Sequence, residues 1–255
     1  MLGGAIERRY RKLRPDVLRL PWGTLARDTR PGPEADAGRR AWTSAAFQEH
    51  RTAAACAATL SALIAIRTPV DLLALASRFP LDELAHVEMC ARLAGELGGG
   101  APVFHQGDAM VALAREDFTP KLQAAELVVR FFCIGEAISI PLLRAGWHAA
   151  THPLVKGVLG RIVKDEAAHG QFGWMFLDWL GPELSDADRA QLGEVAGEAI
   201  GELEARWAEL EAQPTAGIPA LGMIETSTYL PLARASLVTH VLEPLAARGI
   251  HPSAP

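Results

Sequence analysis

Asp82-Glu83-Leu84-Ala85-His86 and Asp165-Glu166-Ala167-Ala168-His169 are two copies of one pattern, Asp-Glu-x-x-His. On an α-helix, residues three apart lie one turn apart on nearly the same face, so the Glu and the His of each copy can bind one metal ion. A single Glu-x-x-His is close to chance expectation in a chain with 8 His, whereas two copies that each follow Asp are not. Some helix bundles bind two metal ions between two such helices, and two further helices each add one Glu. The repeated motif therefore predicts a helical bundle around two metal ions.

The sequence around the motifs supports this fold. Apolar periodicity, interrupted by Pro and Gly, predicts helices at residues 41–67, 69–97, 120–150, 153–180, 185–211 and 224–248. Pro80 and Pro141 fall inside two of these helices and must kink or divide them. The long connection at 98–119 predicts that the second and third helices are parallel, whereas the short connections elsewhere predict antiparallel neighbours. We therefore expect an all-α protein, a four-helix bundle with one long crossover and two additional C-terminal helices.

The chain is expected to have three parts. Residues 1–40 are basic and rich in Pro, and we expect them to form an arm that lies over the surface. Residues 41–180 contain both motifs and form the metal-binding bundle. Residues 181–255 form a helical extension that packs on the bundle.

Composition excludes several classes of protein. The chain has 255 residues, is 49% hydrophobic and carries a net charge of −5, which is typical of a soluble globular protein and gives no reason to expect a nucleic-acid partner. The longest apolar run, 53–66, is too short to span a bilayer, so no membrane association is expected. No secretory signal is evident, and Cys56, Cys90 and Cys133 lie far apart. We therefore expect a reducing, cytoplasmic location.

Two further carboxylate ligands are needed if the bundle binds two metal ions. Glu136 lies in the apolar stretch 131–138, where an unpaired charge would be costly, so it is the candidate in the third helix. Glu126, nearer the start of that helix, fits an ordinary exposed acid. In the first helix Glu49 is the only acidic residue between positions 41 and 66 and is therefore the candidate there.

With these residues, the stretch 41–180 resembles the ferritin-like di-iron carboxylate superfamily. It is most similar to the oxygen-activating oxidases and oxygenases, including the aldehyde-deformylating oxygenases and the arylamine N-oxygenases, in its ligand spacing and in Gly135-Glu136-Ala137 and Asp165-Glu166-x-x-His169. The resemblance implies a ferritin-like four-helix bundle that binds two Fe ions. It implies the ligand set Glu49, Glu83, His86, Glu136, Glu166 and His169. The N-oxygenases have a third His where this chain has Ile162, which counts against aromatic-amine N-oxygenation.

Residues next to the ligands have expected roles as well. Asp82 and Asp165 could hydrogen-bond the second ring nitrogen of a ligand His and fix its orientation. Five apolar residues each lie one helical turn from one of the ligands. They either line a dry cavity or simply pack the core. These residues are Phe79, Phe132, Ile140, Ile162 and Phe172.

The function expected from this sequence is that of a di-iron oxidase or oxygenase. It would use O₂ to oxidise a small, mainly apolar organic substrate and would need an external electron donor or reductase. Two alternatives stay open, a di-manganese catalase or peroxidase-like enzyme and a ferritin-like iron-binding or storage protein. Manganese, or one Mn and one Fe, could replace the two Fe ions, and a homodimer is compatible with the sequence.

Overall fold

Residues 3–102 and 114–253 are described by the computed structural model, and their regular structure is helical. In these residues the one β-type pairing is an isolated bridge between Ile218 and Met223. The expected all-α class is therefore confirmed. Within the same residues, none of the helices combines the length and the apolar composition that crossing a bilayer requires.

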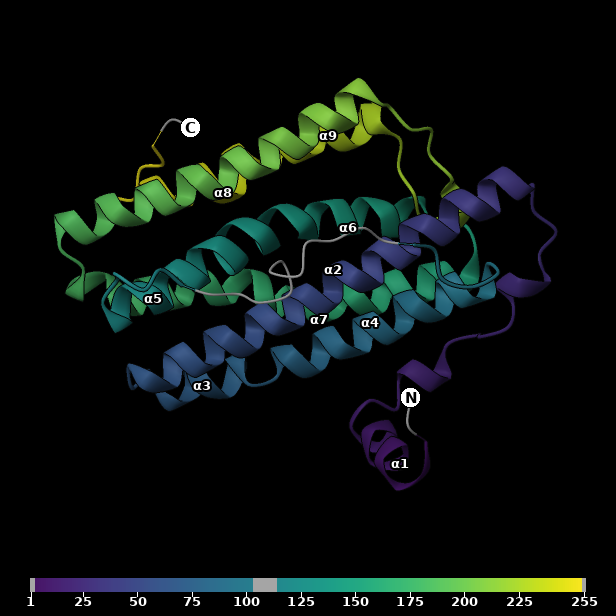
Figure 1. The fold of residues 1–255 in the computed structure, drawn as a ribbon, viewed down its shortest axis with the longest axis horizontal. Helices are drawn as coiled ribbons and strands as arrows, with labels where there is room; N and C mark the ends of the chain where they lie inside the picture. Colours follow the sequence, from purple (N-terminus) through teal and green to yellow (C-terminus); the bar gives the residue numbers. More distant parts are fainter. Residues whose placement is uncertain (1–2, 103–113, 254–255) are drawn as a thin grey trace.

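The centre of the molecule is a bundle of long helices (Figure 1). Its helices are α2 (Gly32–Ala65), α3 (Val70–Ala76), α4 (Phe79–Glu96), α5 (Pro120–Leu127), α6 (Ala137–Ala149) and α7 (Pro153–Leu180), with a π-helix, Val128–Glu136, between α5 and α6. α2 packs along α4, α6 packs along α7, and α4 also contacts α7. In Figure 1, α4 and the α5–α6 helix both run from left to right, whereas α2 and α7 run from right to left. The expected crossover at 98–119 includes 103–113, which lie outside the described residues.

Prolines at the start of a helix change the predicted helix boundaries. α2 begins at Gly32 rather than near residue 41, with Pro31 as its N-cap and Pro33 in its first turn. Proline is compatible with a first turn because the N–H groups there have no partner within the helix. Pro80 occupies the same place in α4, so the predicted helix 69–97 is divided into α3 and α4. Pro141, by contrast, lies inside α6, which continues without a break.

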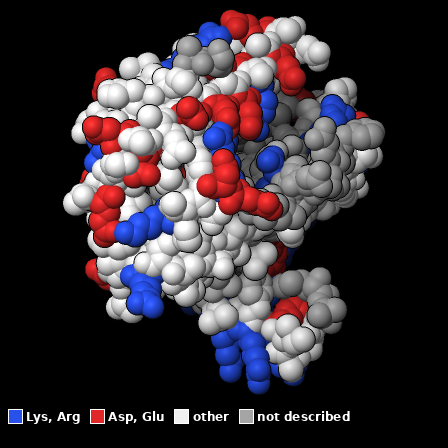
Figure 2. Space-filling view, turned by 60° about the vertical axis from the view of Figure 1, so that its left-hand side comes forward, with Lys and Arg blue, Asp and Glu red and all other residues white. Residues whose placement is uncertain are grey.

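The N-terminal segment is more ordered than an arm lying loosely on the surface. Its first part is a short helix, α1 (Gly4–Leu13), which carries exposed basic side chains that gather at the projecting lower end of the molecule in Figure 2. The following residues dock on α4, with Val17 and Leu25 fully buried. The Glu96 carboxylate accepts hydrogen bonds from the backbone N–H groups of Leu25 (2.9 Å) and Ala26 (3.2 Å).

The C-terminal helices cover one side of the bundle. They are α8 (Asp186–Ala212), α9 (Thr226–Ser236), a π-helix (Leu237–Leu242) and α10 (Glu243–Ala246). α8 begins with a capping box in which Ser185 and Asp188 bond each other's backbone N–H groups. α8 packs on the π-helix of the bundle and α9 on α6, so that Leu192 and Val195 belong to the same core as Phe132. The extension thus supports the helix that carries Glu136.

Candidate metal centre

All six predicted ligands lie together in the interior of the bundle. α2 contributes Glu49, α4 contributes Glu83 and His86, the π-helix contributes Glu136 at its last position, and α7 contributes Glu166 and His169. Five of the six are buried, whereas the side chain of Glu49 is 15% exposed. The four helices therefore meet at one cluster of carboxylates and imidazoles.

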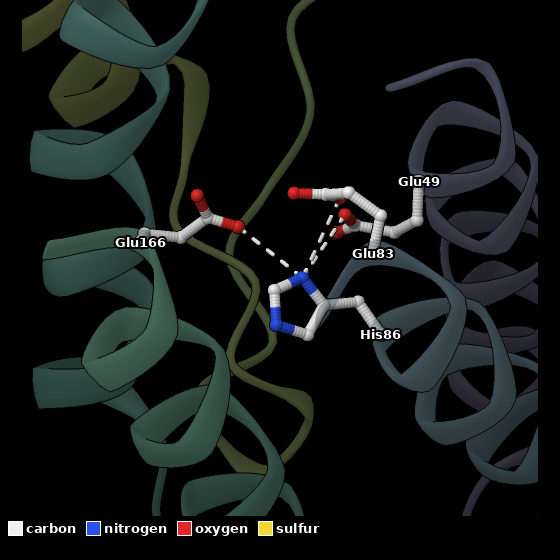
Figure 3. A group of neighbouring side chains, drawn as sticks. All are labelled: Glu49, Glu83, His86 and Glu166. Carbon is white, nitrogen blue, oxygen red and sulfur yellow. Dashed lines mark ion pairs between the residues drawn. The ribbon is translucent and has the colours of Figure 1, made fainter. Parts of the chain in front are cut away.

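The six side chains form two overlapping groups. Glu49, Glu83, His86 and Glu166 form one group (Figure 3), and Glu83, Glu136, Glu166 and His169 form the other. Within each group, one potential ligand atom per residue lies within 4.8 Å of all the others. Glu83 and Glu166 belong to both groups, so each could bridge two metal ions. Buried Glu and His groups of this kind could hold metal ions.

The imidazole nitrogens that face the carboxylates are the Nδ1 atoms. His86 Nδ1 lies 3.2 Å from Glu166 Oε1 and 3.5 Å from Glu49 Oε2. Figure 3 marks both ion pairs with dashed lines. His169 Nδ1 lies 2.8 Å from Glu166 Oε2 and 3.0 Å from Glu83 Oε1. Each His therefore directs the same ring nitrogen towards the middle of the cluster.

Several buried oxygen and nitrogen atoms of this cluster lack a hydrogen-bond partner, and bound cations would satisfy them. Both carboxylate oxygens of Glu83, Glu166 Oε2 and the Nδ1 atoms of both histidines are buried and make no hydrogen bond. If the Nε2–H of His86 donates to Asp165, its Nδ1 presents a lone pair to carboxylate oxygens, and this arrangement is unfavourable without a proton or a cation between them. Four carboxylates supply the charge that balances two divalent ions. The residues present therefore fit a pair of divalent metal ions.

Protons can hold the cluster together when no metal is bound. Burial, assisted by the charge of Glu83, raises the pKa of Glu49 to about 8 although the nearby imidazole of His86 acts in the opposite direction. Burial and then the neighbouring carboxylates raise the pKa of Glu136 well above its usual range. Burial disfavours protonation of His169, but the carboxylates of Asp82, Glu166 and Glu83 around its ring outweigh burial and raise its pKa to about 12. Metal binding would then release protons from these residues.

The two Asp residues of the motifs lie next to the ligand histidines, but each lies next to the His of the other motif. Asp165 Oδ2 is 3.3 Å from Nε2 of His86, whereas Asp82 Oδ2 is 3.7 Å from Nε2 of His169, just beyond hydrogen-bond distance. The expected hydrogen bond to the second ring nitrogen is thus within reach for His86 but not for His169, and the crossed pairing follows from the antiparallel contact of α4 with α7.

One charged residue near the centre was missed by the sequence analysis. The guanidinium of Arg14 donates hydrogen bonds of 2.7 Å to both Asp82 and Asp165, and Arg14 is only 4% exposed. Nothing in the sequence distinguishes Arg14 from the other arginines of the N-terminal segment. Its position depends on how that segment docks, which helical periodicity does not predict.

The apolar residues expected around the site are distributed unevenly. Phe79, Phe132 and Phe172 pack against one another with ring centroids 5.0–5.5 Å apart, and the Phe79 ring lies 4.2 Å from that of His169. Ile140 is buried against Gly170 of α7, and Ile162 belongs to a separate core cluster with Met89 and Leu159. The aromatic wall therefore lies on the His169 side of the centre.

The helix that carries Glu136 differs from the expectation in two respects. Its middle is π-helical, a rare conformation that is frequent at functional sites, and Glu136 ends this segment. The hydroxyl of Ser139, 3.2 Å from Glu136 Oε2, can donate a hydrogen bond to it. Glu126 was expected to be an exposed acid, but it is buried and accepts hydrogen bonds from Arg130 (3.1 Å) and from the backbone N–H of Arg115 (2.8 Å). These partners explain how a second Glu of the same helix is buried outside both ligand groups.

Comparison with known proteins gives no family assignment, because no family model matches the chain and no curated protein is significantly similar to it.

Proposed function

We propose that this protein is a non-haem di-iron oxidase or oxygenase that uses O₂ to oxidise a small, mainly apolar organic substrate. The observation that carries the proposal is the pair of overlapping buried ligand groups, each with three carboxylates and only one His. Hard carboxylate oxygens suit iron and manganese, and one imidazole per metal leaves coordination positions for oxygen or substrate. When bound, two Fe(II) ions would supply the electrons that reduce O₂, and an external reductase would have to return them.

The arrangement of the helices supports a ferritin-like fold for this enzyme. The two Glu-x-x-His helices, α4 and α7, contact each other, and α2 and the α5–α6 helix each add one Glu. α4 and α5–α6 run in the same direction, as a bundle with one long crossover requires (Figure 1).

The protein's own residues have distinct roles in this proposal. Glu83 and Glu166 would hold both metals, whereas Glu49 and Glu136 would each hold one. Asp165 would keep the proton of His86 on Nε2, so that Nδ1 remains free to bind a metal. The Phe79, Phe132 and Phe172 side chains would exclude water from the His169 side and favour an apolar substrate there.

Oxygen uptake by the Fe(II)-loaded protein tests this function. We expect uptake to stop after about two Fe(II) ions per chain have been oxidised and to resume when a chemical reductant is added, because a two-metal centre stores only that many electrons. Oxygen consumption should be followed together with the iron content, with Glu83→Ala as the inactive control.

Two results would replace this proposal with one of its alternatives. Oxidation that continues far beyond two Fe(II) ions per chain and leaves a mineral core would indicate iron storage. Rapid disproportionation of hydrogen peroxide by the Mn(II)-loaded protein, without oxygen uptake by the iron form, would indicate a catalase.

A further inference from the structure

Arg14 is a buried cation that joins the two motifs from outside the bundle. Its Nη1 donates to Asp82 Oδ1 of α4 and its Nη2 to Asp165 Oδ2 of α7, each over 2.7 Å. All three side chains are at least nine-tenths buried. The two ends of one planar guanidinium thus fix the positions of two carboxylates on facing helices, which a single ammonium group does less well.

The two Asp residues link Arg14 to the candidate ligands. Asp165 lies 3.3 Å from Nε2 of His86, and Asp82 lies 3.7 Å from Nε2 of His169. The opposite nitrogen of each ring, Nδ1, faces the carboxylate cluster. A movement of either Asp would therefore change the orientation or the tautomer of the His beside it.

We propose that Arg14 is a positioning residue of the metal centre, which holds Asp82 and Asp165 so that both histidines present Nδ1 to the metal ions. This inference rests on the proposed metal-binding function. It assigns to the N-terminal segment a direct part in completing the centre, although that segment provides none of the six ligands.

Other contacts hold the segment in the place where Arg14 reaches the motifs. Arg11 donates a hydrogen bond of 2.7 Å to Glu88. Asp16 forms an ion pair with Arg161, in which Arg161 Nε lies 2.7 Å from Asp16 Oδ2. Arg161 also bonds Asp165, so Asp165 is held from both sides. Because the segment and the metals act on the same Asp–His pairs, docking of the segment and metal binding should strengthen each other equally.

Arg14→Met tests the proposal through the sign of the change in metal affinity. Removal of a positive charge near the centre would by itself strengthen cation binding, whereas loss of positioning should weaken Mn(II) binding by roughly 10–100-fold, as is typical when partners of ligand side chains are removed. Arg14→Lys restores the charge without the two-pronged geometry and should bind Mn(II) with intermediate affinity. The visible spectrum of the Co(II)-loaded protein should also change in Arg14→Met, because it reports ligand geometry directly.

The matched control is Arg11→Met, which removes a neighbouring arginine that also pairs with a carboxylate of α4. We expect its Mn(II) affinity to stay within about threefold of wild type, since Glu88 belongs to neither ligand group. Unchanged or tighter Mn(II) binding by Arg14→Met would overturn the proposal. An equal loss in both variants would overturn it as well, because general docking of the segment would then explain the effect.

A measurement on the wild-type chain covers the case in which Arg14→Met does not fold. Saturating Mn(II) should slow hydrogen exchange of the backbone amides in residues 14–27 by roughly tenfold more than in α8, as expected from reciprocal coupling. Equal slowing in both regions would contradict the proposal. If wild-type protein binds no metal at all, the proposed function fails, whereas normal metal binding without coupling to residues 14–27 refutes only the role of Arg14.

Discussion

Glu83→Ala should abolish tight binding of both metal ions, whereas Glu136→Ala should abolish the binding of only one. Glu83 belongs to both ligand groups, and Glu136 belongs only to the group that contains His169. Loss of Glu83 therefore removes a charged ligand from each metal, but loss of Glu136 leaves Glu49, Glu83, His86 and Glu166 intact. Metal content after dialysis against a weak chelator gives the count for each variant.

Glu88→Ala is the control for this experiment, because Glu88 lies on the same helix and pairs with Arg11 rather than with the cluster. It should keep both metals. Retention of two metal ions per chain by Glu83→Ala would show that Glu83 is not a required ligand of either metal ion. Equal losses in Glu83→Ala and Glu136→Ala would contradict the bridging position of Glu83.

Phe172→Ala should lower the free energy of unfolding of the metal-free protein by about 3–5 kcal/mol, the usual cost of emptying the space of a buried Phe. The Phe172 ring is fully buried and packs edge-on against both Phe79 and Phe132. The C-terminal extension adds Leu192 and Val195 to the same buried core. Urea denaturation monitored by circular dichroism provides the measurement.

Val70→Ala serves as the comparison, since Val70 is 81% exposed and its truncation should change stability by no more than about 0.5 kcal/mol. A loss below about 1 kcal/mol in Phe172→Ala would mean that the three phenylalanines do not form a tightly packed wall. Such a result would also remove the argument that the His169 side of the centre is closed to water.

The repeated Asp-Glu-x-x-His motif predicted that its Glu and His residues lie together, and the structure brings them together, because helical periodicity places them on one face. It led to the helices on which Glu49 and Glu136 lie, and the structure brings both of these residues into the cluster. Helix boundaries were less predictable where Pro occurs, since Pro is compatible with the first turn of a helix as well as with a loop. Pro31 and Pro33 were read as part of a surface arm and instead stand at the start of α2.

Arg14 and Ser139 could not be predicted for a different reason. Their roles depend on contacts between elements that are distant in the sequence or on a local change of helix type, and neither leaves a periodic pattern. Arg14 contacts residues 68 and 151 positions away. Ser139 lies three residues after Glu136, directly beyond the π-helix. The burial of Glu126 had the same origin, because its partner Arg115 lies outside the helix.

Anaerobic titration of the metal-free wild-type protein with Fe(II) or Mn(II) shows whether the Glu–His cluster is a two-metal centre. We expect tight binding that saturates at two ions per chain, with magnetic coupling between the two ions because Glu83 and Glu166 reach both groups. Saturation at one ion, two magnetically isolated ions, or no tight binding at all would contradict it.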